Sequence, residues 1–203
     1  MKQRELEKIA NALLGPRLIT MGFAIFGRAF SRTIPSGVIH TILYGLDTRS
    51  NHSFQMLCGL NATVLCDTQS PHQAGVLGGR HLTLDGWSVN SGRWACHNEE
   101  TAIASLESIR ALIDDLVEPW FQYNVSLTSV ADVIRVNELG LVKARLYYAA
   151  GCKDEAIAAV HQYLERLRSP TAWDSPAWLN SETDAATILL RELEYTPLNN
   201  RAK

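Results

Sequence analysis

The feature that most constrains this fold is a short turn, Ile34-Pro35-Ser36-Gly37, between two apolar segments. Proline supplies the fixed φ of a type I turn, and the glycine can take the left-handed position of a three-residue hairpin loop. The turn therefore predicts a hairpin with a defined register. The expected cross-strand pairs are Ile34 with Val38, Arg32 with His40, Phe30 with Ile42, and Arg28 with Tyr44.

Alternation along the two strands then divides the side chains of residues 22–46 between two faces. One face mixes charged and aromatic groups: Phe26, Arg28, Phe30, Arg32, His40, Ile42 and Tyr44. The other is small and apolar: Phe23, Ile25, Ala29, Ile39 and Leu43, with Gly27 and Gly45. We expect helices to cover the apolar face and solvent to reach the mixed face.

The order of the remaining elements indicates the fold class. A charged amphipathic helix precedes the hairpin, and strand patterns follow it as far as residue 96, interrupted by a turn-rich loop at 67–79. After that the pattern is helical: residues 98–118 closed by Pro119, a short helix at 129–136, a helical hairpin at 137–168 around Gly151, and a last helix at 181–194. Strands followed by helices predict an α+β fold. We expect an N-terminal helix, an antiparallel sheet of four to six strands, and C-terminal helices including an αα-hairpin.

Composition sets the domain organisation and narrows the classes of partner. A chain of 203 residues suits one domain or one domain with an appendage. We expect a sheet domain at 1–125 with a helical extension at 126–203 packed on it as one compact unit. The formal net charge of −2 lacks the basic footprint of a nucleic-acid-binding domain. No apolar run reaches the length needed to span a bilayer, so we expect no membrane partner and a cytoplasmic location.

Several fixed points resemble a bacterial family known as domain of unknown function number 4304. These are Gly22 and Phe23, Phe30 and Arg32, the strand Phe54 to Leu60 with Gly59, Trp94, and the step Val117 to Phe121. The match runs from about Leu6 to Leu167, with a single Trp where a doublet is common and a longer loop at 67–79. The resemblance implies an α+β domain and no particular activity.

The mixed face of the hairpin is the candidate binding site, through Arg28, Phe30, Arg32, His40 and Tyr44. Arginine offers a forked donor for carboxylate or phosphate, and aromatic rings offer stacking surfaces. The plainer alternative is a solvated sheet face on which long side chains cover apolar neighbours. If exposed, the aromatic and aliphatic members would form a patch suited to a protein partner.

Metal and catalytic motifs are weak in this sequence. Zinc-ligand residue types occur at Cys66, Asp67, His72, His81, Cys96 and His97, but without the tight pairs that zinc sites use. The motifs G-x-S-x-G, H-E-x-x-H and the phosphate loop are missing. We expect no metal and no cofactor.

We therefore expect a non-enzymatic protein-interaction module, for example an immunity-type or regulatory protein. The alternative is an enzyme or binder of a small anionic ligand on the Arg/His/Tyr face.

Overall fold

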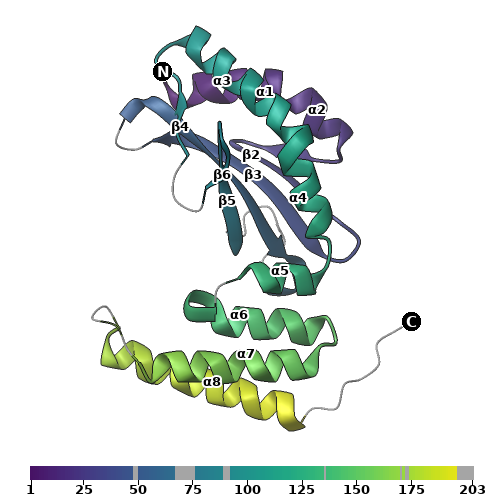
Figure 1. Cartoon of the computed structure of the whole chain (residues 1–203), viewed down its shortest axis with the longest axis vertical. Coiled ribbons are helices and arrows are strands. Elements are labelled where there is room, and N and C mark those ends of the chain that lie inside the picture. The colour runs from purple at the N-terminus through teal and green to yellow at the C-terminus, as the bar shows by residue number, and fades with distance from the viewer. Residues whose placement is uncertain are drawn as a thin grey trace. The chain divides into compact units, whose positions relative to one another are not determined.

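The structure is a computed structural model, and it describes residues 1–47, 50–66, 76–88, 92–134, 136–169, 171 and 174–195. The chain divides into two compact units, unit 1 (Met1–Val125) and unit 2 (Ser126–Lys203). Figure 1 shows that the labelled strands belong to unit 1, whereas the labelled elements of unit 2 are helices. No helix in these described ranges is long and apolar enough to cross a membrane.

Unit 1 is an antiparallel sheet with helices before and after it. The described strands are β1 (Ala24–Phe26), β2 (Ala29–Thr33), β3 (Val38–Asp47), β4 (Ser50–Ala62), β5 (Gly78–Thr83), β6 (Gly86–Ser88) and β7 (Trp94–Ala95). They form one seven-stranded sheet in the order β1-β2-β3-β4-β5-β6, with β7 also paired to β4. The α+β class and the antiparallel sheet are confirmed. The strand number exceeds the expected four to six because Gly27 and Arg28 turn the chain and split the expected first strand.

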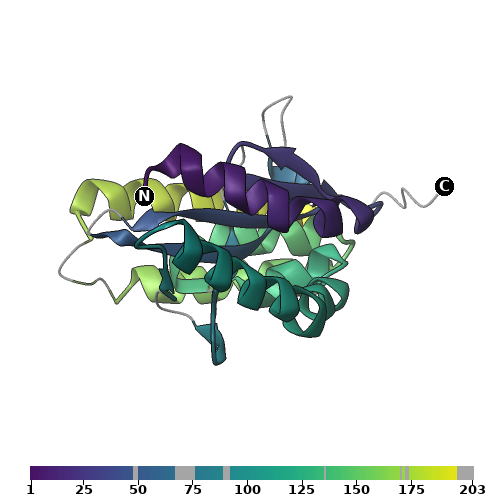
Figure 2. The ribbon, with the colours of Figure 1, turned by 90° about the horizontal axis from the view of Figure 1, so that it is seen from above.

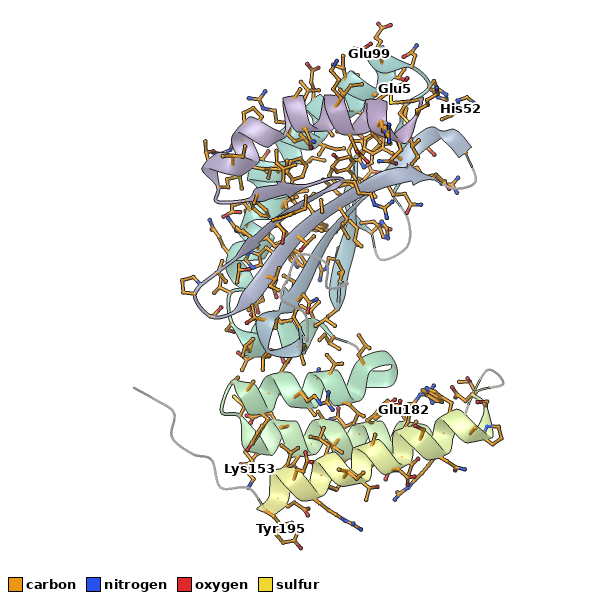
Figure 3. All side chains as sticks on the ribbon, turned by 180° about the vertical axis from the view of Figure 1, so that it is seen from behind. Glu5, His52, Glu99, Lys153, Glu182 and Tyr195 are labelled. Carbon is orange, nitrogen blue, oxygen red and sulfur yellow. The ribbon has the colours of Figure 1, made fainter. Side chains whose placement is uncertain are left out.

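The helices of unit 1 pack on one face of this sheet (Figures 1 and 2). They are α1 (Gln3–Leu13), α2 (Gly15–Thr20), α3 (Glu99–Leu112), the π-helical segment η3 (Ile113–Val117) and α4 (Glu118–Tyr123); a short 3-10 helix, η1 (Thr63–Leu65), follows β4. Their apolar stripes bury Leu6, Leu14, Leu106, Ile109 and Phe121 completely. Figure 3 shows side chains filling the layer between α1 and the strands. This layer is the core of unit 1.

The long helix does not end at Pro119 as expected. The π-helical segment Ile113–Val117 follows α3, and Pro119 then lies in the first turn of α4. A proline is tolerated there because the first turn of a helix leaves its backbone N–H groups without helical partners. The helical path therefore continues to Tyr123, and this extension carries Glu118 and Phe121 to the sheet.

Unit 2 contains α5 (Leu127–Val133), α6 (Val136–Ala149), α7 (Lys153–Leu167) and α8 (Pro176–Tyr195). The expected αα-hairpin is present as α6 and α7, with Gly151 in the left-handed region at φ 82°. The cap of α5 is Ser126 rather than Ser129, which instead completes a reciprocal capping box. The last helix begins five residues earlier than expected, at Pro176. The packing of this extension on the sheet domain stays a prediction.

The contact between α6 and α7 depends on Gly140. A Cβ at this position would lie 2.5 Å or less from Cβ and two ring atoms of Tyr163 on α7, so the helices would have to separate. We expect Gly140→Ala to lower the free energy of unfolding of unit 2 by about 1–3 kcal/mol, the usual cost of overpacking a core. Chemical denaturation, monitored through amide exchange in α6 and α7, measures this loss of stability.

The matched control is Gly15→Ala in α2. Its Cβ would lie 3.4 Å from Ile25 Cδ1, an ordinary contact, so the helix propensity of alanine makes this change neutral or stabilising by up to ~1 kcal/mol. Equal losses of stability from the two variants would contradict the close approach at Gly140.

Candidate binding groove on the open sheet face

The hairpin register is confirmed, but the expected exposure of its mixed face is wrong. Arg32 pairs with His40 and Phe30 with Ile42, as the turn predicts. Phe30, His40 and Ile42 are nevertheless completely buried, and Tyr44 is 2% exposed. Apart from Phe26 and Arg28, the mixed face is therefore the face that the helices cover, and solvent reaches part of the opposite face.

Arg32 is largely buried, with its side chain 13% exposed, and all three of its guanidinium nitrogens have partners. Its Nη2 donates to both carboxylate oxygens of Glu118 at 3.1 and 2.9 Å, and its Nη1 donates to the carbonyl oxygen of Met21 at 2.8 Å. Its Nε donates to His40 Nδ1 at 3.2 Å, while the guanidinium lies 4.5 Å from the ring centroid of Phe23. These contacts neutralise the guanidinium with a carboxylate and occupy all three of its nitrogens, so it is already committed to internal partners.

His40 completes this buried network as a neutral imidazole. Its Nδ1 accepts from Arg32, so the ring proton lies on Nε2 and is donated to the carbonyl oxygen of Asn124 at 2.8 Å. The ring stacks on Phe121 at a centroid distance of 4.5 Å. Burial lowers the pKa of His40 to about 4, although its hydrogen bond to Asn124 opposes the shift. His40 and Arg32 thus join β2 and β3 to α4.

Tyr44 is also part of the core rather than of an open surface. Its hydroxyl donates to Asn11 Oδ1 at 3.1 Å and approaches the carbonyl oxygen of Gly27 at 3.3 Å. Burial raises the pKa of this phenol. Its ring lies 5.9 Å from that of Phe30, a spacing typical of aromatic pairs. Both residues stabilise the contact between sheet and helices.

Arg28 alone among the predicted site residues lies on the opposite face. Its carbonyl oxygen accepts from the backbone N–H of Tyr44 at 3.1 Å, which agrees with the predicted pairing. However, Gly27 (φ 58°) and Arg28 form the turn between β1 and β2, so strand alternation does not apply to the Arg28 side chain. A Cβ added to Gly45 would lie 3.7 Å from Arg28 Nη1, so the guanidinium of Arg28 lies over Gly45.

We call the face opposite α1–α4 the open face, and one row of residues crosses it from β1 to β6. Consecutive strand pairings align Phe26, Ala29, Leu43, Leu57, His81 and Ser88. Directly paired residues in antiparallel strands point to the same face, so these six side chains form a cross-strand row. Phe26 is 40% exposed, and Leu43, Leu57 and His81 are partly exposed.

A groove of about 230 Å³ lies beside this row. Its lining comprises Arg28, Leu43, Tyr44, Gly45, Leu46, Gln55, Leu57 and His81. Within the described ranges, the side chains of Arg28 and Gln55 make no hydrogen bond or ion pair, and His81 Nδ1 is buried without a partner. Burial lowers the pKa of His81, which favours its neutral form. The groove thus combines an apolar floor with three polar side chains that can donate hydrogen bonds.

Comparisons of this chain with protein-family models, curated proteins and solved structures find no match. The resemblance to domain-of-unknown-function family 4304 therefore stays a prediction.

The zinc-ligand types noted in the sequence do not converge among the described residues. Within these ranges no three His, Cys, Asp or Glu side chains lie where they could hold a metal ion. Cys96 is completely buried, whereas the adjacent His97 is exposed. Asp67 and His72 lie outside the described residues.

Sequence reasoning missed Gln55 as a candidate site residue and considered His81 only as a possible zinc ligand. Gln55 lies on β4 and His81 on β5, and only the pairing of Leu57 with His81 brings them to one place. An available signal was the alternation of Ser53, Gln55 and Leu57 against the buried Phe54, Met56 and Cys58. It marks the exposed side of β4, but nothing local in the sequence fixes the register of β5.

Proposed function

We propose that this chain is a non-enzymatic binding module that recognises a protein partner through the open face of unit 1. The observation that carries this proposal is the cross-strand row from Phe26 to Ser88, which spans six strands and keeps Phe26, Leu43 and Leu57 partly exposed. An exposed face of an antiparallel sheet is usually polar, so a central apolar row supports an interaction surface.

The size of the groove favours a protein over a drug-sized ligand. Small-molecule pockets usually enclose about 300–1,000 Å³, and this groove has about 230 Å³. That space suits one side chain of a partner, with the rest of the partner lying over the row. The edge strand β1, whose three residues are all exposed, adjoins this surface and offers backbone groups to the same partner.

A small-anion binder is the second candidate function. It now relies on Arg28 with Gln55 and His81, because Arg32 and His40 are occupied by each other and by Glu118 and Asn124. The groove offers hydrogen-bond donors, and no Ser, Cys, Asp or Glu is among the described residues that line it. This favours binding over group transfer. The immunity-type or regulatory role in the cytoplasm is part of the first proposal, in which the chain binds a protein partner.

Leu57→Lys tests the open face as the binding surface. A charge in the middle of the row would have to be desolvated on binding, so we expect affinity for the partner to fall at least about tenfold. Calorimetry with a partner identified from the native host measures this, and amide exchange in β3 and β4 checks that the sheet stays folded.

Leu84→Lys is the matched control. Leu84 is 71% exposed at the turn between β5 and β6, outside the cross-strand row, and we expect its substitution to leave affinity unchanged. If both lysine variants bind like the unmodified protein, another surface makes the interaction.

A further inference from the structure

We infer that the groove formed by Arg28, Gln55 and His81 binds one carboxylate, supplied by an Asp or Glu side chain of the protein partner. This inference rests on the proposed function and adds the chemistry of the group that the open face selects. The groove lies at the centre of the cross-strand row, so a carboxylate bound there would fix the position of the partner across the strands.

All three polar side chains of the groove match a hydrogen-bond acceptor. The guanidinium of Arg28 can donate only, the amide of Gln55 has two N–H donors, and a neutral imidazole has one. Because His81 Nδ1 has no partner among the described residues, its ring proton is free to take the tautomer that a ligand requires. An anion in the groove would accept from the Arg28 and Gln55 side chains, which have no partner among the described residues.

Among the described residues, the Arg28 side chain has no hydrogen-bond or ion-pair partner, unlike three other arginines of unit 1. Arg32 is paired with Glu118, Arg17 with Asp114, and Arg93 with Asp47, so these guanidinium groups already have carboxylates. Over Gly45, by contrast, the Arg28 guanidinium lies on the sheet beside Leu43 and Leu57. Apolar side chains beside a guanidinium lower the local dielectric on that side and so strengthen an ion pair formed there.

The charge of the groove favours a carboxylate over a phosphate. Among the described residues of the lining, Arg28 is the only formally charged one, and the lowered pKa of His81 leaves the imidazole neutral near pH 7. One positive charge balances a carboxylate, whereas a phosphate group carries about −1.5 to −2 at pH 7. The groove is also small enough for a single side-chain head group.

Side-chain NMR of the full-length chain tests this inference with acetate as the probe. We expect acetate to shift the signals of Arg28 Nε–H, the Gln55 amide and the His81 ring, and acetamide at the same concentration to leave them unchanged. Arg28→Gln should weaken acetate binding by about tenfold or more, since a hydrogen bond to a charged group is lost. Arg110→Gln on α3, an exposed arginine far along the chain from the groove residues, is the matched control and should bind acetate normally.

Three outcomes would overturn the inference. They are signals that respond to inorganic phosphate but not to acetate, signals that respond to neither, and an equal loss from Arg28→Gln and Arg110→Gln. Any of these would leave the proposed function standing, because that proposal depends on the effect of Leu57→Lys on partner affinity. Conversely, if acetate binds in the groove but Leu57→Lys does not change affinity for the partner, the carboxylate site is supported and the open face is not the partner-binding surface.

Discussion

Replacing Arg32 with methionine is expected to lower the free energy of unfolding of unit 1 by about 3 kcal/mol, whereas Arg28→Met should change it by less than ~0.5 kcal/mol. The two arginines lie four residues apart in the same hairpin, but the Arg28 side chain is exposed whereas that of Arg32 is only 13% exposed. Its removal leaves Glu118 Oε2, His40 Nδ1 and the carbonyl oxygen of Met21 without their donor. Denaturant unfolding of the full chain, followed by amide exchange in β3, measures both changes.

A double variant separates the ion pair from the packing of the Arg32 stem. Glu118→Gln removes the charge that Arg32→Met strands, so the double variant should regain part of the lost stability. Arg28→Met serves as the control for loss of an arginine from this hairpin. Similar losses from Arg28→Met and Arg32→Met would show that the assignment of the two faces is wrong.

The second large effect is a dependence of stability on pH that comes from His40. Its pKa is about 4 in the folded chain against an ordinary value of 6.5, because burial disfavours the charged ring. Between these values the unfolded chain binds the proton and the folded chain does not, so stability falls as the pH falls from 6.5 towards 4. At ~1.4 kcal/mol per pKa unit, the loss over this window is about 3 kcal/mol.

His40→Gln identifies this contribution, because glutamine does not titrate and keeps an amide donor for the carbonyl oxygen of Asn124. The free energies of unfolding of the unmodified protein and of His40→Gln are measured from pH 7.5 to pH 4. Between pH 6.5 and 4, the slope of the unmodified protein against pH should be steeper by an amount that corresponds to uptake of nearly one proton on unfolding. Above pH 7 the slopes should agree. If the two curves of unfolding free energy against pH run parallel over the whole range, His40 is not a buried neutral residue, whatever the absolute stability of the variant.

These contrasts show what the sequence could and could not predict about the fold. Turn chemistry is local, so Pro35 and Gly37 were sufficient for the register of β2 and β3. The prediction that solvent reaches the mixed face is wrong, because it assumed that polar side chains such as Arg32 and His40 face solvent. Their partners, Glu118 and Asn124, lie 86 and 84 residues further along the chain, and no local pattern indicates pairing over that separation.

The candidate site was less predictable than the fold for the same reason. Arg28 was correctly paired with Tyr44, but its side chain follows the turn that begins at Gly27. An isolated glycine within a strand pattern is a signal for such a break. Gln55 and His81 meet only through the register of β5 on β4, which depends on pairing between strands separated by a long connection.

Site-specific photo-cross-linking in the native host tests the open face most directly as the partner-binding surface. A benzophenone amino acid at Leu57, in the cross-strand row, should cross-link to one defined protein, and the same probe at Arg110 on α3 should not. The acidic residue of that protein nearest the cross-link would then be the candidate ligand of Arg28. The account is contradicted if position 57 yields no specific product while position 110 does, or if both positions capture the same proteins.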